Sequence, residues 1–255
     1  MPAGSKPLPS FDFGTVLAAT MPRTSVMSAS ASSAPSAPGT SPTRDPSPDL
    51  AHQLAARAVA HLIGRSADDV ALRSLCRHCG GAHGVLSVGA PVDSGVTVSL
   101  SRAPGLVVAA ASLLGPIGID IESVGRMTRA PVDAVALHPI ELDALAQLDP
   151  AVRDHARTMQ WTRKEALLKA TGFGLRIPPG SIALSGLGDV ALDQSNETVQ
   201  LVDAPDLLWN DLDEGDLTPV FDDLRGVGAR HPQSTVSASN DLVGSLCVLL
   251  SSSRE

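Results

Sequence analysis

Two short stretches of this chain carry residues that could do chemistry together. In the first, residues 118–122, Asp120 and Glu122 occupy alternate positions of an apolar run. Side chains alternate between the two faces of a strand, so both carboxylates would lie on one face. Neighbouring carboxylates repel each other unless a cation lies between them, and such oxygen ligands suit Mg²⁺. The alternative is an exposed strand edge that carries two acidic side chains.

The second stretch begins at Trp161 and contains Lys164, Glu165 and Lys169. At helical spacing these side chains lie on one broad side of a helix, with Glu165 beside Trp161. The chain has only three lysines, the third being Lys6, so two of them around one glutamate are unlikely to be accidental. A lysine ammonium suits a phosphate oxygen. The alternative is a surface Glu165–Lys169 pair, worth about 0.3–0.5 kcal/mol. Together the two stretches predict a divalent-metal and diphosphate site.

The elements that must position these residues follow from hydrophobic periodicity. It predicts helices over 49–63, 132–136, 139–148 and 152–170, and strands over 15–19, 96–100, 106–111, 117–121, 182–184, 199–202 and 242–250. A mixed order of strands and helices without a regular alternation indicates an α+β fold. Residues 21–48 are rich in Ser, Ala and Pro, so we expect 1–48 to be mostly disordered. We also expect deletion of residues 1–45 to leave the thermal stability nearly unchanged.

Composition narrows the class of protein. Apolar residues make up 43% of the 255, which is enough for a core. The formal net charge is −8, and the eight acidic residues of 203–223 account for the whole excess, which we interpret as a solvated loop. The remainder is neutral, which argues against a nucleic-acid partner. No apolar run is long enough to span a membrane, and the N-terminus makes a poor signal peptide. We therefore expect a cytoplasmic monomer.

Cysteine spacing offers a second, weaker metal hypothesis. Cys76 and Cys79, with His83 and possibly His78, resemble half of a zinc knuckle. The alternative is a Gly-rich turn that carries two small buried thiols. Three cysteines in all cannot form a disulfide framework, which fits a reducing compartment.

The two chemical stretches resemble the signature pair of the 4′-phosphopantetheinyl transferases, G-[IV]-D-[ILV]-E followed by W-[ST]-x-K-E-A-x-x-K-x-x-G. Residues 76–84 also resemble the C-x-x-C-G-G-x-H-G turn of actinobacterial members. Glu141 stands where the larger, surfactin-type members carry a third acidic position. The resemblance implies a duplicated α+β fold, in which two similar halves, 49–113 and 114–255, meet along a pseudo-twofold axis and bind coenzyme A between them.

The implied activity is that of a holo-[acyl-carrier-protein] synthase. The 4′-phosphopantetheine group would pass from coenzyme A to a serine of an apo acyl or peptidyl carrier protein in fatty acid, polyketide or nonribosomal peptide biosynthesis. By the resemblance, three carboxylates would hold Mg²⁺, namely Asp120, Glu122 and Glu165. Coenzyme A would contact Lys164, Lys169 and Ser99. The catalytic groups would be Glu165, Lys169 and Glu141, with either glutamate as the acceptor of the serine proton.

Two departures from the family pattern support a rival interpretation. The family usually has Ser-His-Ser where this chain has Leu100 between two serines. It also usually has a basic residue and a proline where this chain has Val85 and Leu86. Arginines elsewhere could compensate, among them Arg57, Arg73, Arg77 and Arg102. The alternative function is therefore a degenerate, non-catalytic member that binds a carrier protein or a nucleotide.

Overall fold

The computed structural model describes residues 13–16, 24–30, 48–74, 79–81, 84–89, 95–129, 132–185, 189–192, 207–212 and 242–249. The helices are α1 (Pro48–Ile63), α2 (Val124–Arg129), α3 (Asp133–Ala136), α4 (Pro139–Ala146) and α5 (Pro150–Thr171), with 3-10 turns η1 (Ala67–Asp69), η2 (Gly174–Arg176) and η3 (Pro179–Ser181). The strands are β1 (Phe13–Val16), β2 (Thr24–Ser30), β3 (Leu72–Ser74), β4 (Leu86–Val88), β5 (Thr97–Ala103), β6 (Leu106–Ser112), β7 (Ile117–Ser123), β8 (Ile182–Ser185), β9 (Asp189–Leu192), β10 (Leu207–Leu212) and β11 (Leu242–Leu249).

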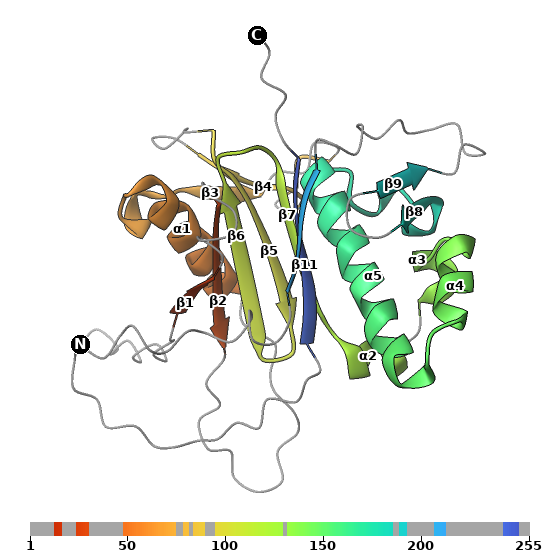
Figure 1. The fold of residues 1–255 in the computed structure, drawn as a ribbon. Coiled ribbons are helices and arrows are strands. Elements are labelled where there is room, and N and C mark those ends of the chain that lie inside the picture. Colours follow the sequence, from red (N-terminus) through yellow and green to blue (C-terminus); the bar gives the residue numbers. More distant parts are fainter. Residues whose placement is uncertain are drawn as a thin grey trace, which may run out of the picture.

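The larger sheet has six strands in the order β1-β2-β6-β5-β4-β3, and every neighbouring pair is antiparallel. Helix α1 covers one face of it (Figure 1). Alternate residues of β6, such as Val107 and Ala109, pack with Leu54 and Val59 of α1 in one apolar cluster. Small alanines on β6 allow the helix to lie close to the sheet.

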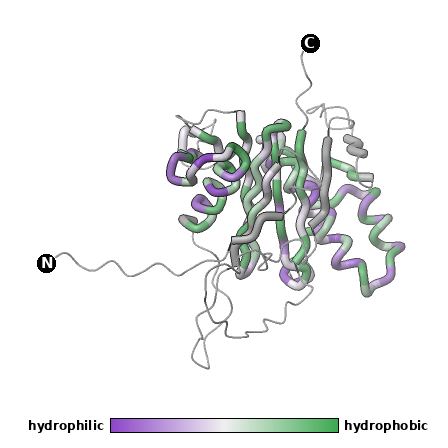
Figure 2. The backbone as a smooth tube through the Cα atoms, turned by 60° about the vertical axis from the view of Figure 1, so that its left-hand side comes forward, coloured by the Kyte–Doolittle hydropathy of each residue, from purple (hydrophilic) through white to green (hydrophobic). Residues whose placement is uncertain are grey.

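A second sheet of three strands, in the order β10-β11-β7, packs against the opposite face of the first. Ile119 and Ile121 of β7 and Leu246 of β11 meet Val108 and Ala110 of β6 in this inner core. Helix α5 covers the outer face of the second sheet, so the layers run α1, sheet, sheet, α5 (Figure 1). Figure 2 shows the central strands mostly hydrophobic and the outer helices with alternating hydrophilic and hydrophobic stretches.

Helices α3 and α4 and the β8-β9 hairpin lie on the far side of α5 (Figure 1). Helix α4 begins with a capping box, in which the His138 side chain accepts from the Ile140 N–H and Glu141 accepts from the His138 N–H. Helix α5 is capped by the Asp149 side chain and ends at Gly172, whose φ of 72° is left-handed.

Helices joined to antiparallel sheets agree with the expected α+β class, while the pseudo-twofold duplication stays a prediction. The expectation of disorder was wrong for residues 24–30, which form β2 and pair with β6 along its whole length. Ser25 and Met27 are buried there. Small side chains carry little hydrophobic signal, but they fit beside an alanine-rich strand whose backbone supplies the partners.

Other elements also differ from expectation. Part of the acidic run is not a loop, because residues 207–212 form β10 and pair with β11. The short strands β3 and β4 and the helix α2 lack a clear periodic signal, and the expected strand at 199–202 lies outside the described residues. No helix among the described residues has the length and apolar character needed to cross a bilayer.

Candidate active site

The acidic stretch lies on β7, at one edge of the three-stranded sheet. Its register with β11 pairs Asp120 with Ser245 and Gly118 with Cys247. Cys247 packs among the apolar residues of α5, so these alternate positions face that helix. Ile119 and Ile121 face the inner core instead. The predicted division of the two faces is therefore present, with Asp120 and Glu122 on the α5 side.

The glycine of this stretch allows α5 to cross directly over β7. A Cβ atom at Gly118 would lie 1.8 Å from the Ala166 carbonyl oxygen and 2.7 Å from the Ala170 nitrogen. Real Cβ atoms essentially never approach backbone so closely, so only glycine permits this crossing. The close approach carries Glu165 and Lys169, which flank Ala166 and Ala170 on the helix, to the carboxylates of β7.

The free edge of β7 is satisfied by two serines of β5. The Ser99 hydroxyl accepts from the Ile119 N–H at 3.2 Å, and the Ser101 hydroxyl accepts from the Ile121 N–H at 3.3 Å. These side-chain contacts replace the ladder bonds of a missing neighbour strand. The Ser-x-Ser spacing thus joins the two sheets, and the sequence did not point to Ser101.

Asp120 lies at the centre of the polar network. Its Oδ1 atom accepts from the Ser101 hydroxyl at 2.8 Å and from the Lys169 ammonium at 2.6 Å. Lys169 also donates to the Ile119 carbonyl at 3.0 Å. The Oδ2 atom of Asp120 is buried, and no donor among the described residues reaches it. A buried carboxylate oxygen without a partner is costly, so a cation or donor that reached it would be stabilised there.

The charge of Asp120 affects the pKa values of the other two carboxylates, Glu122 and Glu165. Burial, and then the charge of Asp120, raise the pKa of Glu122 to about 6, although Arg126 and Lys169 oppose the shift. The same two causes raise the pKa of Glu165, and Lys169 again opposes them. Asp120 therefore repels both glutamates, as neighbouring carboxylates do when no cation lies between them.

The described residues contain no group of three His, Cys, Asp or Glu side chains already close enough together to hold a metal ion. In the present arrangement the Lys169 ammonium lies against Asp120, where it neutralises part of the negative charge. The donor set nonetheless suits Mg²⁺, because all three groups are carboxylates and Asp120 keeps one unpartnered oxygen.

Lys164 and Glu141 lie away from this network. The Lys164 side chain is fully buried, forms an ion pair with Glu141 and donates to the Ala136 carbonyl at 2.8 Å. The second oxygen of Glu141 accepts from the Leu184 N–H at 2.9 Å. Desolvation lowers the pKa of Lys164, and Glu141 partly offsets this. Lys164 was expected to contact a phosphate, and Glu141 was a candidate acceptor of the serine proton. Instead they form a buried ion pair that joins α3, α4 and β8 to α5.

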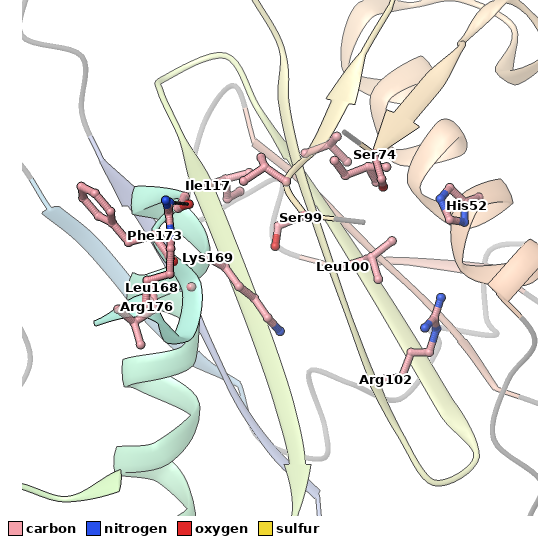
Figure 3. Close-up of a pocket in the computed structure, with 16 residues that line it drawn as sticks. His52, Ser74, Ser99, Leu100, Arg102, Ile117, Leu168, Lys169, Phe173 and Arg176 are labelled. Carbon is pink, nitrogen blue, oxygen red and sulfur yellow. Dashed lines mark hydrogen bonds between the residues drawn. The ribbon is translucent and has the colours of Figure 1, made fainter. Parts of the chain in front are cut away.

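A pocket of about 500 Å³ opens next to Lys169, between α1, β5 and the end of α5. Its polar wall residues are His52, Ser74, Ser99, Arg102, Lys169 and Arg176. Figure 3 shows Lys169 reaching from α5 towards Leu100 and Arg102, with His52 beyond them on α1. None of the described residues that line the pocket is Asp or Glu, so its charged groups favour an anion.

The pocket lies where β4 and β5 separate. Within the described part of the chain, these strands pair at Ser87 with Thr97, and no described strand lies beside the following residues of β5 on that edge. Leu100 is half-buried there and faces the pocket, while Ser99 on the other face is 7% exposed. His52 and Phe173, which no motif singled out, reach the pocket through tertiary structure alone.

The zinc hypothesis is largely outside the described part of the chain. Cys76, His78 and His83 all fall in the undescribed ranges. Cys79 is exposed, and its sulfur accepts from the Gly81 N–H at 3.4 Å. Arg77, one of the arginines that could compensate, also lies outside the described residues.

Comparison with known families adds independent information. Residues 116–212 match the family model of the 4′-phosphopantetheinyl transferase superfamily. The matched region begins just before β7 and includes α5, so it contains the three carboxylates and Lys169. No curated protein matches the chain.

Proposed function

We propose that this protein transfers the 4′-phosphopantetheine group of coenzyme A to a serine of an apo acyl or peptidyl carrier protein, with Mg²⁺ as cofactor. The position of Lys169 carries the proposal. Its ammonium lies against Asp120 at 2.6 Å, and its side chain also lines the pocket. An anion in the pocket would thus meet the carboxylates through one shared cation.

The pocket has the chemistry that coenzyme A needs. Apolar side chains such as Val98, Ile117 and Leu168 form much of its wall, and Arg102 and Lys169 supply charge. A ligand with a phosphorylated end and a less polar body fits such a wall. Ser99, Leu100 and His52 border the same space, so Ser99 is kept as a candidate contact.

Three carboxylates would hold the magnesium ion, namely Asp120, Glu122 and Glu165. When bound, Mg²⁺ would supply positive charge to the diphosphate and would offset the repulsion by Asp120 that, after burial, raises the pKa values of Glu122 and Glu165. Lys169 would then be released from Asp120 to contact a phosphate oxygen.

In the reaction, the carrier serine oxygen forms a bond to the β-phosphorus of coenzyme A. The bond from that phosphorus to the bridging oxygen breaks, and adenosine 3′,5′-bisphosphate leaves with the electron pair. Glu165 accepts the serine proton, because of the two glutamates considered for this role it is the one whose charge interacts with Asp120 and Lys169. Lys169 stabilises the charge that builds on the phosphoryl oxygens.

Glu141 is not assigned as the base. Both of its oxygens are engaged, one by the Leu184 N–H and the other by Lys164 and the His138 N–H. It is only 3% exposed, and it does not line the pocket. We assign Glu141 and Lys164 the structural role of fixing α4 and β8 on α5.

A second candidate function is binding without efficient transfer, and Leu100 is the observation that favours it. Leu100 occupies the pocket wall beside Ser99, where it cannot donate a hydrogen bond to a phosphate. Leu100→His would add a donor at this wall. If Leu100 limits the affinity, coenzyme A should bind more tightly to the variant than to the wild type.

The deciding experiment is mass spectrometry of carrier proteins after incubation with the protein, coenzyme A and Mg²⁺. Several apo carriers should be tested. We expect at least one of them to gain the mass of a 4′-phosphopantetheine group. A carrier with its acceptor serine replaced by alanine and the variant Lys169→Met are the controls. Binding of carrier and coenzyme A with no mass gain would support the second candidate instead.

A further inference from the structure

We propose that Val85, Phe173, Leu175 and Arg176, the pocket rim, form a docking surface for the carrier protein. The partner would present apolar side chains and acidic groups next to its acceptor serine. This inference rests on the proposed function and adds the surface at which that function recognises its protein substrate.

The pocket rim consists of apolar side chains that stay open to solvent. Val85 is 50% exposed, Phe173 42% and Leu175 66%. Val85 and Phe173 also line the pocket, so the rim and the pocket are continuous. The two segments meet, since a Cβ atom at Gly172 would lie 3.4 Å from the Cγ2 atom of Val85. An exposed apolar group around a pocket mouth is typical of an interaction surface.

Arg176 stabilises the part of the rim at Phe173 and the adjoining Gly172. Its guanidinium donates to the Phe173 carbonyl at 3.0 Å and to the Gly172 carbonyl at 3.1 Å. The same group lies 5.6 Å from the centre of the Phe173 ring. Gly172 and Gly174 have φ values of 72° and 55°, which few other residues adopt easily. A surface fixed in advance loses little entropy when a partner binds.

Charge indicates which partner fits. Segments 84–89 and 172–181 contain Arg176 and no acidic residue, although the whole chain has a net charge of −8. The pocket below adds Arg102 and Lys169, and its described lining residues include no Asp or Glu. A partner with acidic groups would therefore approach this mouth in preference to the rest of the molecule. A serine delivered here would arrive beside Lys169.

Leu175 offers a clean test, because it is exposed but does not line the pocket. Ile140 is the matched control, since its side chain is an isomer of leucine, is 64% exposed and lies on α4. Leu175→Ser should raise the KM for the carrier about tenfold and leave the KM for coenzyme A unchanged. Ile140→Ser should change neither value.

Two further variants at the same position test the charge argument. Leu175→Glu and Leu175→Lys both remove the apolar contact, but only glutamate would repel an acidic partner. The KM for the carrier should therefore be several-fold higher for Leu175→Glu than for Leu175→Lys, and this gap should shrink as salt is added.

The outcomes separate this inference from the proposed function. If the wild type transfers the group and Leu175→Ser keeps a normal carrier KM, the docking surface is wrong and the function stands. A change in oligomeric state, or a large loss of thermal stability, would show that a second copy or the chain itself covers Leu175, and would also overturn the inference. If the wild type modifies no carrier, the proposed function fails and the docking surface fails with it.

Discussion

The two serines of β5 form a matched pair for testing how Asp120 is held. Each accepts a hydrogen bond from the free edge of β7, at 3.2 Å for Ser99 and 3.3 Å for Ser101. Only Ser101 also donates to Asp120, at 2.8 Å. Ser99→Ala and Ser101→Ala therefore each remove one equivalent contact to the backbone of β7. Only Ser101→Ala also removes the hydrogen bond to the Asp120 carboxylate.

The structure sets the expected magnitudes. Loss of one backbone contact in Ser99→Ala should lower the free energy of unfolding by about 1 kcal/mol. Ser101→Ala loses in addition a hydrogen bond to a charged group, worth about 1.5–3 kcal/mol, so its cost should be about 3 kcal/mol. Asp120→Ala should then be additive with Ser99→Ala within about 0.5 kcal/mol, but should couple with Ser101→Ala by more than 1 kcal/mol.

Urea unfolding of metal-free protein measures these energies, and Mn²⁺ binding followed by electron paramagnetic resonance provides a second measurement. Groups that orient a metal ligand typically contribute about 10–100-fold to affinity. Ser101→Ala should therefore weaken Mn²⁺ binding by about tenfold, and Ser99→Ala should leave it unchanged. Equal effects of the two substitutions on both stability and Mn²⁺ affinity would refute the assignment of Ser101 as a positioning residue.

Four further predictions follow from the contacts. Gly118→Ala should cost about 3 kcal/mol in urea unfolding and abolish transfer, because α5 must move off β7; normal stability would contradict the crossing. Lys164→Met should cost about 3–5 kcal/mol by leaving the buried charge of Glu141 without its cation, and Glu141→Gln in the same chain should recover part of this loss. Because the pKa of Glu122 is raised to about 6, its carboxylate binds a proton more tightly in the folded metal-free protein than in the unfolded chain. Stability relative to Glu122→Gln should therefore rise as pH falls from about 7 to 4.5, by about 1 kcal/mol after allowance for solvent screening; a constant difference in calorimetry would exclude this. Deletion of residues 1–30 removes β2 and should lower the melting temperature by more than about 5 °C, whereas an unchanged value would mean that β2 contributes no stability.

The sequence predicted the local part of the site well. The alternation around Asp120 and Glu122 determined that they share one face of a strand, because side-chain direction on a strand depends only on position. Helical spacing likewise put Glu165 and Lys169 on one side of α5. The glycine of the first stretch was recognised as part of a pattern, but its physical role required the helix above it.

Misjudged residues depended on neighbours that are distant in the chain. The wheel of α5 grouped Lys164 with Glu165 and Lys169, yet Lys164 is buried against Glu141 on the far side of the helix. Periodicity gives an angle around a helix axis, and it does not say which layer covers that angle. The prediction of disorder was wrong for β2 for a similar reason, because the small residues of this strand are stabilised by pairing with β6.

The sequence by itself identified the chemical groups of the candidate site. Residue type and short-range spacing pointed to the three carboxylates and to Lys169. Only the tertiary structure decided how they are arranged. It placed α5 on Gly118, joined Lys169 to Asp120, and opened a pocket beside the part of β5 that follows its pairing with β4. Side-chain contacts between layers depend on how sheets and helices pack, and that packing is a property of the whole chain rather than of any window within it.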